Sequence, residues 1–204
     1  MTIPEAPTAE ISLLLPEVWF SLPLNPAPNP ADLQIEGWDE GTITKFTALL
    51  TLLGEKGKAA NITTAAAAIY DVGGEVTVTS VAAGYQRFSE LTALGEHDMT
   101  DIFTSAGTTD NPEAAQSSAN LDAATESSEV SSLDLPIGPA ARRQRSIFIS
   151  DDHPSTIIID FVIRPTATPD TAVTLSFSAF GARPEAFVGL FDGLATGLHV
   201  MGGS

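Results

Sequence analysis

The sequence contains no cysteine among its 204 residues. This absence excludes a disulfide-stabilised scaffold, zinc held by thiolates and catalysis by a thiol nucleophile. Stability must therefore come from an ordinary hydrophobic core. Hydrophobic residues make up 43% of the chain, which is enough to form one.

Basic residues are also scarce: nine Lys and Arg stand against 26 Asp and Glu, for a formal net charge of −17. Binding to nucleic acid needs clustered lysines and arginines that displace counterions from the phosphates. Anionic membrane surfaces attract basic segments in the same way. The charge balance therefore predicts no nucleic-acid partner and disfavours binding to membrane surfaces.

No stretch has the features of a targeting or membrane-spanning segment. The first basic residue is Lys45, whereas a secretory signal begins with positive charge. The apolar run from 11 to 24 is interrupted by Pro16, Glu17 and Pro23 and is too short to span a bilayer. We therefore expect a cytoplasmic protein that does not insert into membranes.

Patterned stretches in the first 80 residues indicate several elements. Residues 13 to 24 alternate like a strand, and their prolines indicate the edge of a sheet. A helix is expected over residues 42–53, where apolar residues recur on one stripe before a glycine. Residues 61 to 78 favour a strand, a turn at Gly73-Gly74 and a second strand.

The C-terminal third has the clearest periodicity. A strand is expected from Leu133 to Ile149, and residues 157–163 and 173–179 alternate as two more strands with their odd-numbered residues on one face. Short proline-containing connections favour an antiparallel meander. A closing helix is expected from Pro184, with an apolar face formed by Phe187, Leu190, Phe191, Leu194 and Leu198.

These elements predict one α+β domain over residues 1–204, in which an antiparallel sheet packs between an early and a C-terminal helix. Residues 104–132 stand apart because Ser, Thr, Ala, Asp and Glu dominate them. Such a composition buries too little apolar surface to offset the entropy of ordering. We therefore expect residues 104–132 to form an acidic, mobile insertion.

The chain shows no complete catalytic set. Acids and imidazoles crowd at His97-Asp98 and at Asp151-Asp152-His153, a combination suited to a metal site or to acid–base catalysis. However, Asp-Asp-His-Pro also has the composition of a surface turn. We therefore favour a non-enzymatic protein without metal or cofactor. Metal or small-ligand binding, or hydrolysis, through His97, His153 and nearby acids is the alternative.

Arg142, Arg143 and Arg145 form a dense basic cluster, with three of the chain's six arginines within four residues. Arginine grips carboxylates and phosphates through a planar fork, so the cluster could contact an anion or a partner. In so acidic a chain, the same arginines could instead neutralise the protein's own acids on a neighbouring strand. We favour the second interpretation.

Gly189, Gly193 and Gly197 repeat every four residues beside the apolar stripe of the expected closing helix. Each glycine inside a helix costs about 1 kcal/mol relative to alanine, so three of them call for an explanation. Close packing of the helix on the sheet is the favoured one. Close approach by another backbone, such as a second subunit, is the other.

Two local patterns resemble a known group of proteins. Residues Leu135 to Arg142 (Leu-Pro-Ile-Gly-Pro-Ala-Ala-Arg) resemble a Leu-Pro-Ala-Gly-Pro-Ala-Val-Arg strand of small actinobacterial proteins of unknown function. Residues Phe187 to Leu198 resemble their closing helix, although Gly193 and Gly197 replace the more usual Ala and Thr. These proteins are similar to members of the PsbP-like α/β/α sandwich fold. The resemblance implies a binding or accessory protein, with some relatives linked to secretion systems or the cell envelope.

Three functions follow from these observations. The first is a non-enzymatic accessory or adaptor protein that contacts another protein, either as a homodimer or in a secretion- or envelope-associated assembly. The second is the small-ligand, metal-binding or hydrolytic domain built on His97 and His153. The third is a structural component of a larger assembly, in which the acidic insertion supplies a charged contact.

Overall fold

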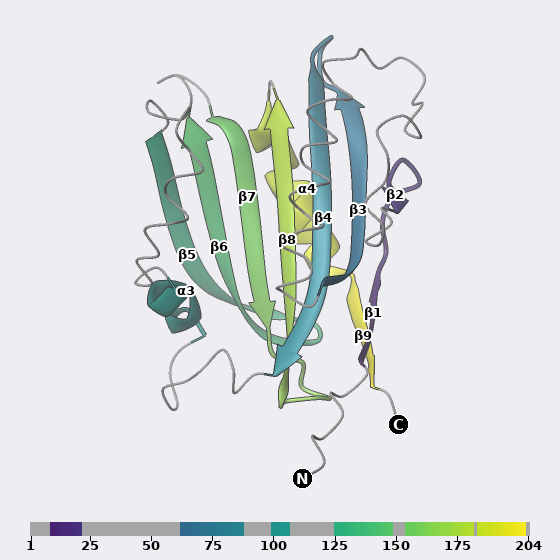
Figure 1. Ribbon diagram of the computed structural model, residues 1–204, viewed down its shortest axis with the longest axis vertical. Coiled ribbons are helices and arrows are strands. Elements are labelled where there is room, and N and C mark those ends of the chain that lie inside the picture. Colours follow the sequence, from purple (N-terminus) through teal and green to yellow (C-terminus); the bar gives the residue numbers. More distant parts are fainter. Residues whose placement is uncertain are drawn as a thin grey trace.

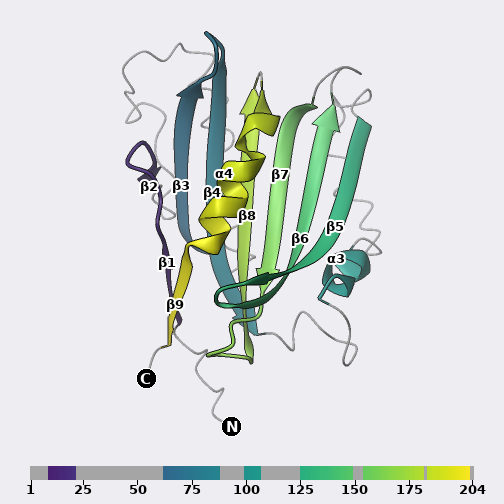
Figure 2. The same ribbon diagram turned by 180° about the vertical axis from the view of Figure 1, so that it is seen from behind.

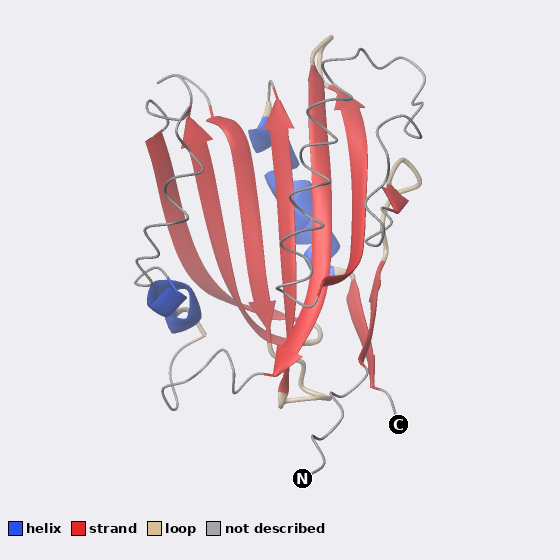
Figure 3. Cartoon of the chain, viewed as in Figure 1, coloured by secondary structure: helices blue, strands red, loops and turns tan. Residues whose placement is uncertain are grey.

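A computed structural model describes residues 9–21, 62–87, 99–106, 125–148, 154–181 and 183–202. Most of these residues lie in strands, which are coloured red in Figure 3. In chain order the strands are β1 (Ala9–Leu13), β2 (Phe20–Ser21), β3 (Ile62–Asp71), β4 (Val76–Arg87), β5 (Thr125–Leu135), β6 (Gly138–Phe148), β7 (Pro154–Ile163), β8 (Thr171–Gly181) and β9 (Leu198–Gly202). The helical elements are α3 (Asp101–Ala106), the 3₁₀ turn η3 (Pro184–Phe187) and α4 (Val188–Thr196).

Seven of the strands form one sheet, in the order β2-β3-β4-β8-β7-β6-β5 (Figure 1). Every neighbouring pair in it is antiparallel. The remaining two strands, β1 and β9, pair with each other in a separate antiparallel ladder. The sheet thus has two edges among the described residues, the two-residue β2 on one side and the 11-residue β5 on the other.

The hairpin of β3 and β4 confirms the strand–turn–strand prediction. Gly73 and Gly74 have φ values of 71° and 86°, which glycine adopts without the steric penalty of other residues. The carboxylate of Asp71 accepts a hydrogen bond of 2.6 Å from the backbone N–H of Gly74. The turn residues therefore determine where the hairpin closes.

The meander of β6, β7 and β8 is also confirmed, and it supplies most of the core. Phe177 of β8 stacks on Phe191 of α4 with ring centroids 5.0 Å apart, and Phe161 of β7 meets Phe177 edge-on at 6.0 Å. Figure 2 shows α4 lying across this side of the sheet, which we call the helix face. Its buried residues from β7 and β8 are the expected Ile157, Ile159, Phe161, Ile163, Val173, Leu175, Phe177 and Ala179.

The α+β prediction is wrong, because the described chain is a mainly-β fold. One helix, α4 with its leading 3₁₀ turn, covers the helix face. On the other side, the opposite face, the six-residue α3 packs through Ile102 and Phe103 against β6, β7 and β8. The early helix expected over residues 42–53 lies outside the described residues.

Strand β5 explains much of this error. It begins at Thr125, inside the stretch 104–132 for which we expected an acidic insertion, and residues 126–132 are all exposed. An edge strand exposed on both faces needs no apolar alternation, so its composition resembles that of a loop. Residues 107–124 lie outside the described part of the chain.

The expected strand over residues 13–24 also needs correction. Strand β1 ends at Leu13, residues 14–19 are not in a strand, and the described part of β2 pairs with β3 at Phe20 and Ser21. Residues 22–24 lie outside the described part of the chain. Trp19 is buried and donates a hydrogen bond of 2.9 Å from Nε1 to the hydroxyl of Tyr70, whereas Val18 is exposed. Trp19 therefore belongs to the core, and its indole nitrogen is satisfied by Tyr70.

The closing helix is shorter than predicted. The helical segment begins at Pro184 with η3, as expected, but ends at Thr196. Leu198 belongs to β9, which pairs with β1 from the other end of the chain. His199 is therefore an exposed residue of β9 rather than part of the helix. Among the helices of the described chain, none combines the length and apolarity needed to cross a membrane.

A turn interrupts the long strand expected from Leu133 to Ile149, whose described residues belong to the end of β5 and to β6. Ile149 lies outside the described residues. Gly138 follows the turn with φ at +147°, and a Cβ atom there would collide with the backbone carbonyl oxygen of Arg164. The neighbouring Pro139 carbonyl accepts a hydrogen bond of 2.9 Å from the Arg164 N–H. The Leu-Pro-Ile-Gly-Pro motif is thus a turn whose glycine allows close backbone approach.

Candidate functional site

The arginine cluster lies on β6, and the alternation of a strand divides it between the two sheet faces. Arg142 points to the helix face, where it meets Asp192 of α4. Arg143 and Arg145 point to the opposite face, where both meet Asp160 of β7. The three arginines therefore do not form one site.

Arg142 connects the sheet to the closing helix. Its Nε donates to Asp192 Oδ1 at 2.8 Å, and one Nη donates to Oδ2 at 3.4 Å. A second hydrogen bond of 2.9 Å runs from the same Nη to the Gln144 side chain. This two-point contact positions α4 on β6 and accounts for Arg142 without a ligand.

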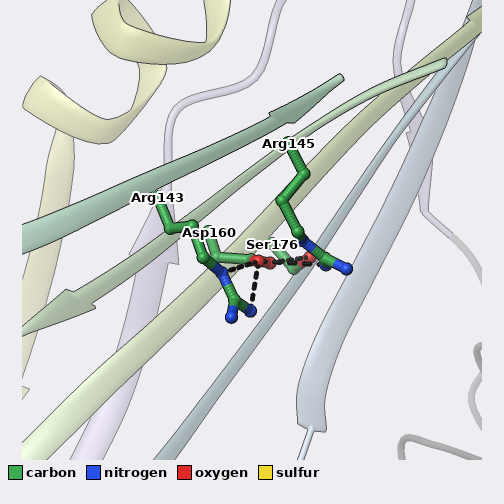
Figure 4. Close-up of polar contacts among 4 residues, drawn as sticks. All are labelled: Arg143, Arg145, Asp160 and Ser176. Carbon is green, nitrogen blue, oxygen red and sulfur yellow. Dashed lines mark hydrogen bonds and ion pairs between the residues drawn. The ribbon is translucent and has the colours of Figure 1, made fainter. Parts of the chain in front are cut away.

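Arg143, Arg145, Asp160 and Ser176 form a polar cluster on the opposite face, drawn in Figure 4. Nη groups of the two arginines donate to Asp160 Oδ2 at 2.9 and 3.1 Å, and the Arg143 Nε donates to the same oxygen at 3.3 Å. The Ser176 hydroxyl donates to Asp160 Oδ1 at 2.8 Å. Three neighbouring strands, β6, β7 and β8, thus hold one carboxylate between two guanidinium groups.

An aromatic ring supports one side of this cluster. The guanidinium carbon of Arg143 lies 4.7 Å from the ring centroid of Phe103 in α3, a cation–π geometry. Phe103 belongs to the small apolar group on the opposite face that also contains Val162. The α3 helix therefore restricts the position of Arg143, while the side chains of Arg143 and Arg145 remain 25% and 29% exposed.

These contacts agree with the favoured interpretation that the arginines neutralise the protein's own acids. They also leave a surplus of positive charge, because two guanidinium groups share one carboxylate. The Nε atom of Arg145 is buried and has no hydrogen-bond partner within the described residues. In the same part of the chain, the second Nη group of each of these two arginines makes no hydrogen bond.

The edge strand β5 is the second candidate surface. Its pairing with β6 runs from Thr125 opposite Phe148 to Leu135 opposite Gly138, without a register shift. Among the described strands it has no neighbour on its other side. Glu126, Glu129 and Asp134 are its charged residues, and all three are exposed.

The register shows which backbone groups of β5 are free to pair. The carbonyl of Pro139 points toward β7, because it accepts the Arg164 N–H. Backbone groups alternate along a strand, so the even-numbered residues of β6 point toward β5 and bond its odd-numbered residues. The N–H and C=O groups of Ser128, Val130 and Ser132 therefore point away from the sheet.

The glycine stripe does not pack on the sheet. Among the described residues, a Cβ atom at Gly189 or Gly193 would meet nothing within 4 Å, and both glycines are exposed. Gly197 is the C-cap of α4, and its N–H bonds back to carbonyls of the last turn. The favoured explanation, close packing on the sheet, is therefore wrong for Gly189 and Gly193.

The histidine clusters are not part of this geometry. His97, Asp98 and the sequence Asp151-Asp152-His153 lie outside the described residues, so metal binding or hydrolysis through them stays a prediction. Within the described ranges, no three His, Asp or Glu side chains gather as a metal site would require.

Four of these contact residues were not predicted from the sequence: Asp160, Ser176, Asp192 and Phe103. Asp160 carried a usable signal, because it is an acid between apolar residues in a strand expected to be largely buried. The alternation of β6 could likewise have separated Arg142 from Arg143 and Arg145. The contacts with Asp192 and Phe103 had no comparable local signal.

Comparisons with known proteins give no family for this chain. No protein-family description matches the sequence, and no curated protein matches it either. Among solved structures, the chain is similar to LpqN of Mycobacterium tuberculosis, which is described as involved in cell envelope biogenesis. The alignment covers 97% of this chain and 87% of the LpqN chain. The sequence identity is 12% and the TM-score is 0.42.

Proposed function

We propose that this protein is a non-enzymatic accessory protein that binds an extended segment of a partner protein by adding it to the sheet at β5. The observation that carries the proposal is the exposed edge, where residues 126–132 are uncovered on both faces. Strand addition of this kind supplies affinity through main-chain hydrogen bonds and specificity through alternating side chains.

The two edges of the sheet differ in how they are protected. Proteins commonly protect an edge with a very short strand, charged side chains, a proline or a bulge. Within the described residues, the edge at β2 has the first device, since the strand is two residues long there. Strand β5 is 11 residues long, contains no Pro and pairs with β6 without a bulge, so its three acidic residues are its remaining protection.

The charges of β5 favour one class of partner. Glu126, Glu129 and Asp134 are exposed and have no basic residue beside them within β5. A partner segment with alternating lysines or arginines would gain favourable cross-strand pairs, whereas an acidic segment would be repelled. A second copy of this chain would bring the same three acids and a further net charge of −17. The partner that fits is therefore an extended segment rich in basic residues.

A proline at an outward backbone position tests the proposal. Val130→Pro removes an N–H that points away from β6, so the sheet itself loses no hydrogen bond and the fold should persist. Val130→Thr is the matched control, since it keeps the N–H and the β-branched shape. We expect Val130→Pro to weaken partner binding about tenfold or more through the lost hydrogen bond and the intruding ring.

Two peptides make the test independent of the natural partner. A ten-residue peptide of alternating Thr and Lys should slow amide hydrogen exchange at Ser128, Val130 and Ser132, and a Thr–Glu peptide should not. Light scattering should show a monomer. Unchanged exchange with the Thr–Lys peptide would contradict the proposal, and so would equal pull-down of cellular proteins by the Pro and Thr variants.

A further inference from the structure

Arg143 and Arg145 carry more positive charge than their own partner neutralises. Both form ion pairs with the single carboxylate of Asp160, so two guanidinium groups and one carboxylate leave a net charge of +1. Asp192 cannot supply the difference, because it contacts Arg142 on the helix face. Among the described acids, no other forms an ion pair with Arg143 or Arg145.

The geometry holds these arginines in place without saturating them. Asp160 is fixed by Ser176 from β8, and the ring of Phe103 supports Arg143. A guanidinium has five N–H donors. Asp160 receives two from Arg143 and one from Arg145, and about a quarter of each arginine side chain is exposed.

We infer that Arg143 and Arg145 together bind a small oxyanion, a carboxylate or a phosphate group, on the opposite face of the sheet. A planar guanidinium matches both groups in geometry, and hydrogen bonds between charged groups are the strong ones. Pre-positioned side chains lose little entropy when the anion arrives. Asp160 lies between the two guanidinium groups and offsets one of their two positive charges, so it also competes with a bound anion.

The charge of the whole protein limits which classes of anion can bind at this site. A net charge of −17 repels polyanions at long range, so nucleic acids and polyphosphates do not fit. A single anionic group on an otherwise neutral or basic molecule avoids this penalty. The site uses other groups than the β5 edge, because the arginines act through side chains on the opposite face and β5 through its outward backbone, although Val130 and Ser128 pair with Arg143 and Arg145.

Arginine side-chain NMR gives a direct test. The Nε–H signals of Arg142, Arg143 and Arg145 are followed while inorganic phosphate or acetate is added at constant ionic strength, with chloride as the reference anion. We expect saturable shifts at Arg143 and Arg145 and none at Arg142, which is occupied on the other face. The anion with the lower dissociation constant identifies the ligand as a phosphate or a carboxylate.

Three variants sharpen the result. Arg145→Gln should weaken anion binding about tenfold, and the matched control Arg142→Gln should leave it unchanged. Asp160→Asn should strengthen binding about tenfold, because it removes the internal competitor for both guanidinium groups. If Arg145→Gln fails to fold, the titrations of the wild-type protein and of Asp160→Asn still test the proposal.

The proposal fails if chloride produces the same shifts, if Arg142 responds as strongly as Arg145, or if Asp160→Asn weakens binding. Strand addition at β5 is judged separately, since Val130→Pro replaces none of the residues Arg143, Arg145, Asp160 and Ser176, although Val130 pairs with Arg143. Either proposal can therefore fail without the other.

Discussion

Replacing Gly193 with alanine should stabilise the protein, although the residue belongs to a regular glycine repeat. Gly193 lies inside α4, is exposed and does not have a positive φ. An added Cβ would meet no atom of the described part of the chain within 4 Å. The substitution therefore introduces no clash and requires no change of backbone conformation.

The expected gain comes from helix propensity alone. Glycine in a helix interior costs about 1 kcal/mol relative to alanine, because it loses more backbone entropy on folding. Neither a steric nor a conformational cost offsets this gain at Gly193. For a chain of 204 residues, the gain raises the melting temperature by roughly 2–4 °C.

Urea unfolding and calorimetry of Gly193→Ala measure this gain, and Gly197→Ala serves as the control. Gly197 is the C-cap rather than an interior residue, and a Cβ there would have an ordinary 3.6 Å contact with the Leu194 carbonyl oxygen. Its substitution should therefore gain less. A destabilised Gly193→Ala would refute the reasoning, because it would mean that another backbone approaches this side of α4.

Three further substitutions should destabilise the fold, each measured by urea unfolding. Gly138→Ala should cost about 2–4 kcal/mol, because its φ is positive and its Cβ would meet the Arg164 carbonyl; a near-neutral result would contradict the close approach. Phe191→Ala should cost about 3–5 kcal/mol, since the ring is fully buried against Phe177. Asp160→Asn should cost about 2 kcal/mol by leaving two guanidinium groups beside each other, and added phosphate should restore part of this loss.

Residues with local patterns were predicted well. The buried alternation of β7 and β8 and the apolar face of α4 follow from spacing along the chain, and Gly73-Gly74 marks the hairpin turn. Each of these signals depends on residues a few positions apart. They therefore appear in the sequence without knowledge of the rest of the fold.

Strand β5 and the ends of α4 could not be predicted in this way. Residues 126–132 are polar because both of their faces meet solvent, so the strand depends on pairing with β6. The helix stops at Thr196 because the next residues pair with β1, nearly the whole chain away. Composition and periodicity contain no information about which distant strands pair with each other.

The arrangement of the arginine cluster likewise follows partly from the sequence and partly from the tertiary structure. The sequence by itself determined that Arg142, Arg143 and Arg145 were dense in an acidic chain and lay on a strand, which is enough to place Arg142 on one face and the other two on the opposite face. Only the tertiary structure decided that Asp192 neutralises the first while the other two share Asp160. That choice depends on which strand and which helix become neighbours of β6, and strand order is a property of the whole fold.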